Sequence, residues 1–188
     1  ITLHLQDVNP VVKGALFYFM EVFKMYNVND AVVYSSYGVC VISAIEERDF
    51  SGESVEYYVL RPVSDNKNTF YVPTSNEDLK NRMHSVCSRS EVEELISVMP
   101  DEDFIWIDND FQRKEEYRRI IESGNRHQLI KLIKTLYIRK QKLLEQHKKL
   151  HSADERFLND AENMLYDEFA YALGIERDAV IPYIKEHI

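Results

Sequence analysis

One change of pattern divides the chain into two parts. From Ala31 to Pro73, apolar side chains recur at every second position, which is the period of β-strands, and β-branched and aromatic types dominate. After Pro73 they recur every three or four positions, which is the period of α-helices. A chain of 188 residues in which strands precede helices is predicted to have an α+β fold, with the sheet and the helices in separate layers or domains.

The strand-forming part contains short runs separated by turn-forming residues. Its longest turn is a polar stretch, residues 46–54, in which Gly52 can adopt the positive φ of a hairpin connection. So few short strands must curl to bury one face, which predicts a small SH3-like or Tudor-like β-barrel. The predicted strands are Ala31–Tyr34, Val39–Ile45, Val55–Arg61 and Thr69–Val72.

The second part is predicted to be an all-α helical bundle. Ser88 and Glu91 have the spacing of a capping box, and so do Ser152 and Glu155. Gly124 is typical of the residue that follows a helix C-terminus. The predicted helices cover residues 88–99, 110–122, 125–146, 152–173 and 176–185, and the boundary with the strand-forming part is placed between Asn76 and Ser88.

The net charge of −9 conceals a strongly basic segment. Residues 111–150 carry twelve Lys and Arg against four Asp and Glu, a balance of +8, whereas the residues before and after have balances of −11 and −6. Gathered cations can neutralise the phosphates of nucleic acid. No side-chain pair suited to reading base edges is evident, so salt-sensitive contacts that tolerate any sequence are predicted. The candidate contacts are Arg113, Lys114, Arg118, Arg119, Arg139 and Lys140, with further cations at Arg126, Lys131, Lys134 and Lys142.

Other classes of function lack their usual signatures. Cys40 and Cys87 have no metal-ligand spacing and are expected to be reduced and structural. His147 and His151 lack the glutamate of a zinc-binding helix, and no glycine-rich phosphate loop or nucleophile motif occurs. The longest apolar stretch, residues 14–23, is too short to cross a bilayer. We therefore expect a cytoplasmic protein that is not an enzyme and has no cofactor, metal, membrane segment or small-molecule substrate.

The order of these features resembles the CarD/CdnL family of bacterial transcription regulators. In the strand-forming part, the resemblance is carried by VNDAVVY (28–34), Gly38-Val39, AIE (44–46), Gly52, EYYVL (56–60) and Val72-Pro73. In the helical part, it is carried by Ser123-Gly124, LIKLIKTLYIR (129–139), DER (154–156) and EFAYALG (168–174). Each motif alone is common, but their joint order over residues 25–174 is specific.

The resemblance implies a division of labour between the two parts. Residues 25–80 are expected to form the Tudor-like domain that binds the β subunit of RNA polymerase. Residues 88–188 are expected to form the helical domain, which contacts promoter DNA at the upstream edge of the melted region and so stabilises the open complex. Residues 1–24 have no counterpart in the family and are expected to be an upstream extension. The protein is expected to be a monomer.

The resemblance also assigns individual residues. Arg48 falls where the family has a polymerase-contacting Arg in the first hairpin, and Glu46, Phe70 and Tyr71 are expected beside it. Tyr71 stands where the family has a basic residue. Trp106, the only Trp, is expected to act as an apolar wedge at the edge of the melted DNA, although Asp110 occupies the position that matches the family's Trp.

A second class of function stays open on the sequence. The acidic total charge and the presence of Asp110 favour a protein-interaction adaptor, in which the strand-forming part grips a peptide and the helices bind protein rather than DNA. The two hypotheses differ in where the cations lie. A common surface of Lys and Arg favours DNA, whereas a scattered arrangement favours the adaptor.

Overall fold

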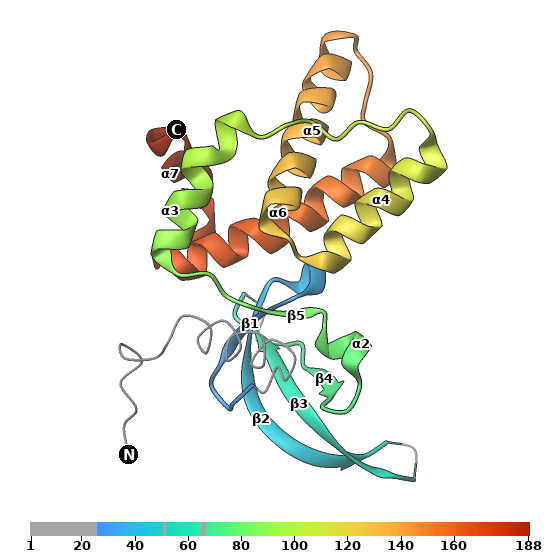
Figure 1. The fold of residues 1–188 in the computed structure, drawn as a ribbon, viewed down its shortest axis with the longest axis vertical. Coiled ribbons are helices and arrows are strands. Elements are labelled where there is room, and N and C mark those ends of the chain that lie inside the picture. Colours follow the sequence, from blue (N-terminus) through green and yellow to red (C-terminus); the bar gives the residue numbers. More distant parts are fainter. Residues whose placement is uncertain (1–25, 51, 65–66) are drawn as a thin grey trace, which may run out of the picture.

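The computed structural model describes residues 26–50, 52–64 and 67–188. Within them an antiparallel sheet comes first and α-helices follow, so the α+β fold expected from the change of period is confirmed (Figure 1). The sheet and the helices form two layers stacked along the long axis of the molecule. The extension expected at residues 1–24 lies outside the described residues.

The sheet is open. Its strands follow the order β4-β3-β2-β1-β5, and the two edge strands do not pair with each other, so the closed SH3-like or Tudor-like barrel is not confirmed. A short helix that was not predicted, α2 (Glu77–Lys80), packs Leu79 against the apolar face and supplies cover that a closed barrel would take from its own strands. The strands are β1 (Ala31–Tyr34), β2 (Val39–Asp49), β3 (Ser54–Pro62), β4 (Phe70–Pro73) and β5 (Met83–Ser85).

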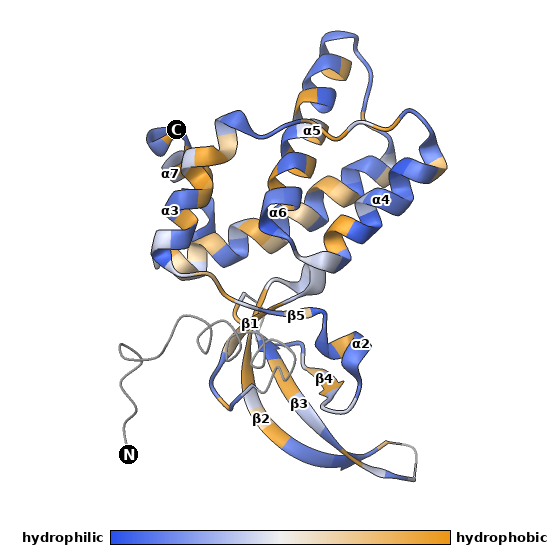
Figure 2. Ribbon diagram, viewed as in Figure 1, coloured by the Kyte–Doolittle hydropathy of each residue, from blue (hydrophilic) through white to orange (hydrophobic). Residues whose placement is uncertain are grey.

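The β2–β3 hairpin is longer than its sequence suggests. Residues 46–49 were expected in a polar turn, but Glu46 pairs with Tyr57, and the ladder continues to Asp49 and Ser54. A β-ladder requires only backbone N–H and C=O groups. The two strands therefore stay paired beyond the residues whose alternating apolar side chains predict a strand. The hairpin therefore projects from the sheet as a curved arm whose distal half is mostly hydrophilic (Figures 1 and 2).

The helices follow the predicted order with small shifts at their ends. Between α3 and α4, residues 102–109 form an extended connector. The last helix begins later than expected, after a single 3₁₀ turn, and Pro182 is its third residue, where a missing N–H breaks no helical hydrogen bond. The helices are α3 (Arg89–Val98), α4 (Asp110–Ser123), α5 (Arg126–Glu145), α6 (Ser152–Leu173) and α7 (Val180–His187). No helix of the described residues has both the length and the apolar character that spanning a membrane requires.

One of the two predicted capping boxes is wrong. Ser88 caps α3 as expected, since its hydroxyl accepts from the Glu91 N–H while the Glu91 carboxylate accepts from the Ser88 N–H. At α6, however, the residue before the helix is His151, and Ser152 already belongs to the first turn. Its hydroxyl therefore cannot act as the N-cap. The glycine signal is confirmed at Gly124, which has φ +59° at the end of α4.

The sheet and the helices share one hydrophobic core. Val33 and Val39 of the sheet pack in the same buried cluster as Tyr117 of α4, Leu132 of α5 and Leu158 of α6. A second cluster joins α3, α5, α6 and α7, and a third lies within the sheet. Burial of this shared core holds the two layers together, since apolar area removed from water contributes about 25 cal/mol per Å².

Close backbone packing and a buried ion pair also join the layers. Gly38, at φ +72°, lies so near α6 that a Cβ there would stand 2.3 Å from Asp167 Oδ2. Arg126 at the start of α5 donates from Nη2 to Glu168 Oε1 of α6 at 2.6 Å and to the Ser85 carbonyl of β5 at 2.6 Å. The same Glu168 oxygen accepts from the Cys87 N–H at 2.8 Å. The orientation of the helices on the sheet is thus set by directional contacts as well as by apolar packing.

We expect both thiols to be protected from alkylation in the native protein. Cys40 and Cys87 are free and buried, and burial raises the pKa of each thiol to about 12. Because the thiolate is the reactive form, iodoacetamide at pH 7.5 should modify neither residue until denaturant is added. Mass spectrometry of labelled protein checks this expectation, and rapid native labelling of either cysteine would contradict it.

Candidate functional site

An exposed aromatic cluster lies at the end of the β2–β3 hairpin. Phe50 is 62% exposed, and its ring lies 5.3 Å from the rings of both Tyr57 and Tyr71 in edge-to-face geometry. The Arg48 guanidinium lies 5.9 Å from the centre of the Tyr71 ring and donates from Nη2 to Glu46 Oε1 at 2.7 Å. We call these five residues the hairpin patch. It is large, exposed and chemically mixed, which is typical of protein-binding surfaces.

The hairpin patch contains three of the four predicted polymerase contacts. Phe70 is the exception, because it is adjacent to Tyr71 in β4 and its ring instead packs against Tyr34 and Tyr37, with centroids 5.8 and 4.2 Å away. Phe50 and Tyr57 were missed by the sequence reasoning. The signal at Phe50 was a single aromatic residue in an otherwise polar hairpin connection.

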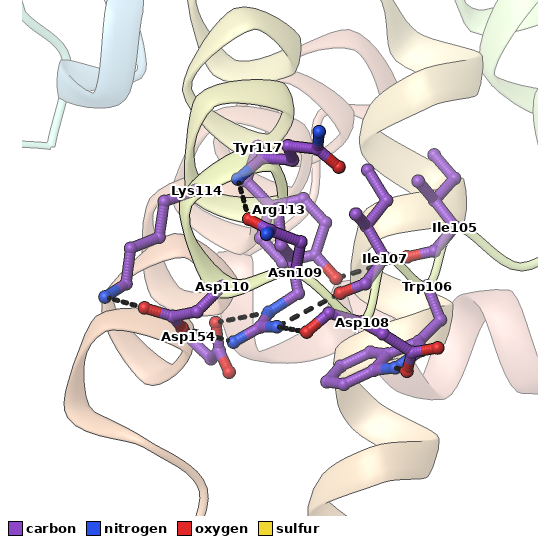
Figure 3. Close-up of polar contacts among 11 residues, drawn as sticks. Ile105, Trp106, Ile107, Asp108, Asn109, Asp110, Arg113, Lys114, Tyr117 and Asp154 are labelled. Carbon is purple, nitrogen blue, oxygen red and sulfur yellow. Dashed lines mark hydrogen bonds and ion pairs between the residues drawn. The ribbon is translucent and has the colours of Figure 1, made fainter.

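Arg113, a predicted phosphate contact, points into the protein instead of toward solvent. Its side chain is buried, and it donates to the Ile107 carbonyl at 3.1 Å, to Asp110 Oδ1 at 2.6 Å and to Asp154 Oδ1 at 3.4 Å (Figure 3). The Tyr117 hydroxyl donates to the Ile105 carbonyl at 3.1 Å. Arg113 therefore fastens the 102–109 connector to α4 and α6, which leaves it few donors for an external ligand.

Trp106 is held on the same connector. Its Nε1 donates to Asp108 Oδ1 at 2.9 Å (Figure 3). Its ring centre lies 4.7 Å from the Arg113 guanidinium and 3.9 Å from that of Arg139. Such stacking of guanidinium groups on indole is worth about 0.5–2 kcal/mol. Trp106 is only partly exposed. Its ring thus contacts two guanidinium groups, and its role as a wedge stays a prediction.

Trp106 lines a cavity between the connector and the helices. We call it the basic cleft. Its volume is about 790 Å³, and its walls come from the connector, the first turn of α4, the end of α5, the α5–α6 turn and the start of α6. The cationic lining comprises Arg113, Lys114, Arg139, Lys148 and Lys149. The acidic lining comprises Asp108, Asp110 and Asp154, which leaves an excess of two positive charges.

Most of the predicted phosphate contacts have an acidic partner. Lys114 donates to Asp110 at 2.6 Å, and this hydrogen bond holds the pKa of the Asp110 carboxyl below its ordinary value. On the exposed face of α4, Arg118 pairs with Glu115 and Arg119 with Glu116. Lys140 pairs with Glu155 at 3.2 Å. These contacts reduce the charge that the four residues present to an external phosphate.

In α4, α5, α6 and the α5–α6 turn, most cations without an ion pair among the described residues gather at one place. Lys134 is the exception, because it lies earlier in α5 and donates to the carbonyls of Met99, Pro100 and Glu102. Arg139 and Lys142 lie in the last turns of α5, and Lys148 and Lys149 lie in the turn that follows. Lys148 Nζ donates to the neutral Gln146 side chain at 3.5 Å. Lys148 and Lys149 were not among the predicted contacts, because they follow the predicted helix and form no helical stripe. The positive charge is thus concentrated at the free end of the α5–α6 pair.

Phe111 is an exposed aromatic residue that the sequence reasoning also missed. It is 74% exposed in the first turn of α4, directly after Asp110. It borders a shallow hollow together with Ile107 and Arg118. A large apolar side chain in this position loses contact with water only when a partner covers it.

The positions of possible metal ligands can be compared with the geometry that a metal ion requires. No group of three or more His, Cys, Asp and Glu side chains in residues 26–50, 52–64 and 67–188 is arranged to hold a metal ion. His147 and His151, which share helical spacing in the sequence, lie in the α5–α6 turn rather than within a helix.

The described residues thus form two parts, an open sheet that carries the hairpin patch and a helical layer with a basic end. Family models place both parts in one family: the CarD-like/TRCF RID domain matches residues 26–87, and the CarD C-terminal domain matches residues 94–185. The chain belongs to the CarD-like family, whose members interact in general with RNA polymerase.

A curated relative agrees with this assignment. The chain is 41% identical over 51 residues to the Putative transcription factor YdeB of Bacillus subtilis (strain 168). The match covers 27% of this chain and 33% of that protein, so it spans about a third of the relative's length.

Proposed function

We propose that the protein binds the β subunit of RNA polymerase through the hairpin patch, contacts upstream promoter DNA through its helices, and so stabilises the open complex. The observation that carries this proposal is the separation of two unlike surfaces. The aromatic hairpin patch and the unpaired cations of the α5–α6 turn lie at opposite ends of the molecule (Figure 1). A protein with this form can hold two partners at once, as a monomer in the cytoplasm.

The polymerase contact combines side-chain and main-chain features. Arg48 with its aromatic neighbours offers the residue types that dominate binding energy at protein interfaces. Beside them, β4 is an edge strand, which can pair with an added strand of the partner. The side chains would then select the partner, while the backbone contributes affinity.

The proposed DNA contact lies toward the end of α5 rather than along α4. Arg139, Lys142, Lys148 and Lys149 form no ion pair among the described residues, so a phosphate need not displace a bound carboxylate from them. Each phosphate neutralised should contribute about −0.9 to the slope of log affinity against log salt. Arg118 and Arg119 must first leave Glu115 and Glu116, so they contribute less.

We further propose that Phe111, rather than Trp106, is the apolar group at the edge of the melted DNA. Phe111 is exposed and next to the position that matches the family's Trp, whereas the Trp106 ring is already stacked on Arg139. Inserting an apolar side chain offsets part of the unstacking cost of a few kcal/mol per base step. Since this contact exists only with melted DNA, it favours the open over the closed complex.

The substitution Phe111→Ala should shorten the open-complex lifetime about fivefold or more, whereas Trp106→Phe should change it less than twofold. The first removes an exposed side chain with little effect on the fold, and the second keeps an aromatic surface for Arg139. The measurement is the decay of competitor-resistant complexes of polymerase and promoter, with and without the protein. A normal lifetime with Phe111→Ala would exclude the Phe111 assignment, and absence of any effect of the wild-type protein would exclude the proposed function.

The adaptor without DNA binding remains the second candidate. It is favoured by the ion pairs that neutralise the exposed cations of α4 and by the net charge of −9. Titration of an upstream-fork DNA with the protein separates the two. Affinity that is weak and independent of salt supports the adaptor, whereas a steep loss of affinity with added salt supports the DNA contact.

A further inference from the structure

The basic cleft has the form of a small-molecule site. Its volume of about 790 Å³ falls in the range of ligand pockets, and it is hollowed between five segments of the chain rather than spread over a flat face. One wall is the Trp106 side chain, and another is formed by Leu143 of α5 and Leu150 of the turn. A surface that served only to follow a DNA backbone would not need a hollow of this size.

The charged side chains of the basic cleft form two groups, carboxylates that are already hydrogen-bonded and cations that have no ion pair. The carboxylates of Asp108, Asp110 and Asp154 already accept from Trp106, Lys114 and Arg113 respectively. By contrast, Arg139, Lys148 and Lys149 line the same hollow without an ion pair among the described residues. Asp108 keeps its charge because its donor, the Trp106 N–H, is neutral, so the three cations exceed the remaining carboxylate by two. Such an excess in one hollow forms a receptor for a compact anion of high charge.

We infer that the basic cleft binds the polyphosphate group of a small molecule, of the kind that nucleoside triphosphates carry. A polyphosphate concentrates several negative charges within the hollow. A duplex presents the phosphates of one strand on a convex surface at about 3.4 Å intervals along the axis, so few of them can enter. Because Arg139, Lys148 and Lys149 are also the proposed DNA contacts, a bound polyphosphate should compete with DNA, and only this competition rests on the proposed function.

Isothermal titration calorimetry with inorganic tripolyphosphate tests the site directly, in about 100 mM salt where long-range attraction is screened. We expect binding of one tripolyphosphate per chain, and an affinity at least about fivefold weaker in Lys148→Ala and in Arg139→Gln. Lys142→Ala is the matched control, because Lys142 is exposed, unpaired and near the end of α5 but does not line the cleft. Equal losses in all three variants, or no loss in any of them, would overturn the inference.

Two further titrations distinguish binding of a nucleotide's polyphosphate from binding of its nucleoside and from binding of DNA. ATP should bind at least as tightly as tripolyphosphate, and adenosine should not bind measurably; adenosine binding as tight as that of ATP would overturn the inference. A short DNA duplex that binds where tripolyphosphate does not would also overturn it while leaving the proposed function intact. Tripolyphosphate binding without any DNA binding would support the site and count against the proposed function. Displacement of labelled DNA by tripolyphosphate would support both.

Discussion

Replacing Arg48 by glutamate is expected to weaken binding to the isolated β-subunit lobe of RNA polymerase at least about thirtyfold. Arg48 is the cation of the hairpin patch, where it lies over Tyr71 and is held by Glu46. Its hydrogen bond to Glu46 raises the pKa of the guanidinium, so the positive charge is permanent. A glutamate there would stand beside Glu46 and Glu47 and would repel any acidic partner surface.

The matched control for this experiment is Arg61→Glu. Arg61 is exposed on β3, and it pairs with Val41 far from the hairpin end, so its substitution makes the same charge change on the same sheet. Biolayer interferometry with the β lobe should give wild-type affinity for Arg61→Glu. Equal losses in the two variants would mean that overall charge, and not the hairpin patch, governs binding. Retained binding with Arg48→Glu would remove Arg48 from the interface.

Replacing Glu168 by alanine is expected to lower the free energy of unfolding by about 3–5 kcal/mol. Glu168 is 3% exposed, and its carboxylate accepts from Arg126 Nε at 3.0 Å and from the Cys87 N–H at 2.8 Å. Its removal leaves the Arg126 guanidinium partly buried without a counter-charge and leaves a buried N–H without an acceptor, which is the costly way to break a buried ion pair. Urea denaturation followed by circular dichroism gives the difference.

Glu162→Ala is the control for Glu168→Ala. Glu162 lies in the same helix and is partly buried, but no hydrogen bond or ion pair holds its carboxylate among the described residues, and burial raises its pKa. Its substitution should change stability by less than about 1 kcal/mol. A loss with Glu168→Ala no larger than the loss with Glu162→Ala would show that the contact between α5, α6 and β5 contributes little to stability.

Local patterns were enough to predict the elements whose stability is local. The strand Ala31–Tyr34 was predicted to the residue, and α4 and α5 were predicted to within about one residue at each end. The apolar period decides all three, and Gly124 marks the end of α4. The wrong predictions concern element ends, where the backbone can either continue the helix or strand or leave it. Ser152 carries the side chain of an N-cap, but His151 takes the N-cap position, and the expected hairpin turn continues as a ladder.

The candidate site was only partly predictable from the sequence. Ion pairs formed on folding decide which cationic side chains remain available to an external partner. Arg113 was predicted among the DNA contacts, but Asp154, 41 residues away, accepts its Nε hydrogen bond inside the protein. Phe111 was overlooked because periodicity alone does not distinguish an exposed aromatic side chain from a buried one. Lys148 and Lys149 were overlooked because the charge of a turn has no period.

By itself, then, the sequence determined that most strands precede the long helices and that residues 111–150 are basic, since these follow from period, capping and composition. Only the tertiary structure decided that the sheet stays open, that Arg113 turns inward and that the unpaired cations meet Trp106 around one hollow. The physical reason is that charge is a property of a residue, whereas exposure and pairing depend on neighbours that are distant in the chain and adjacent only after folding.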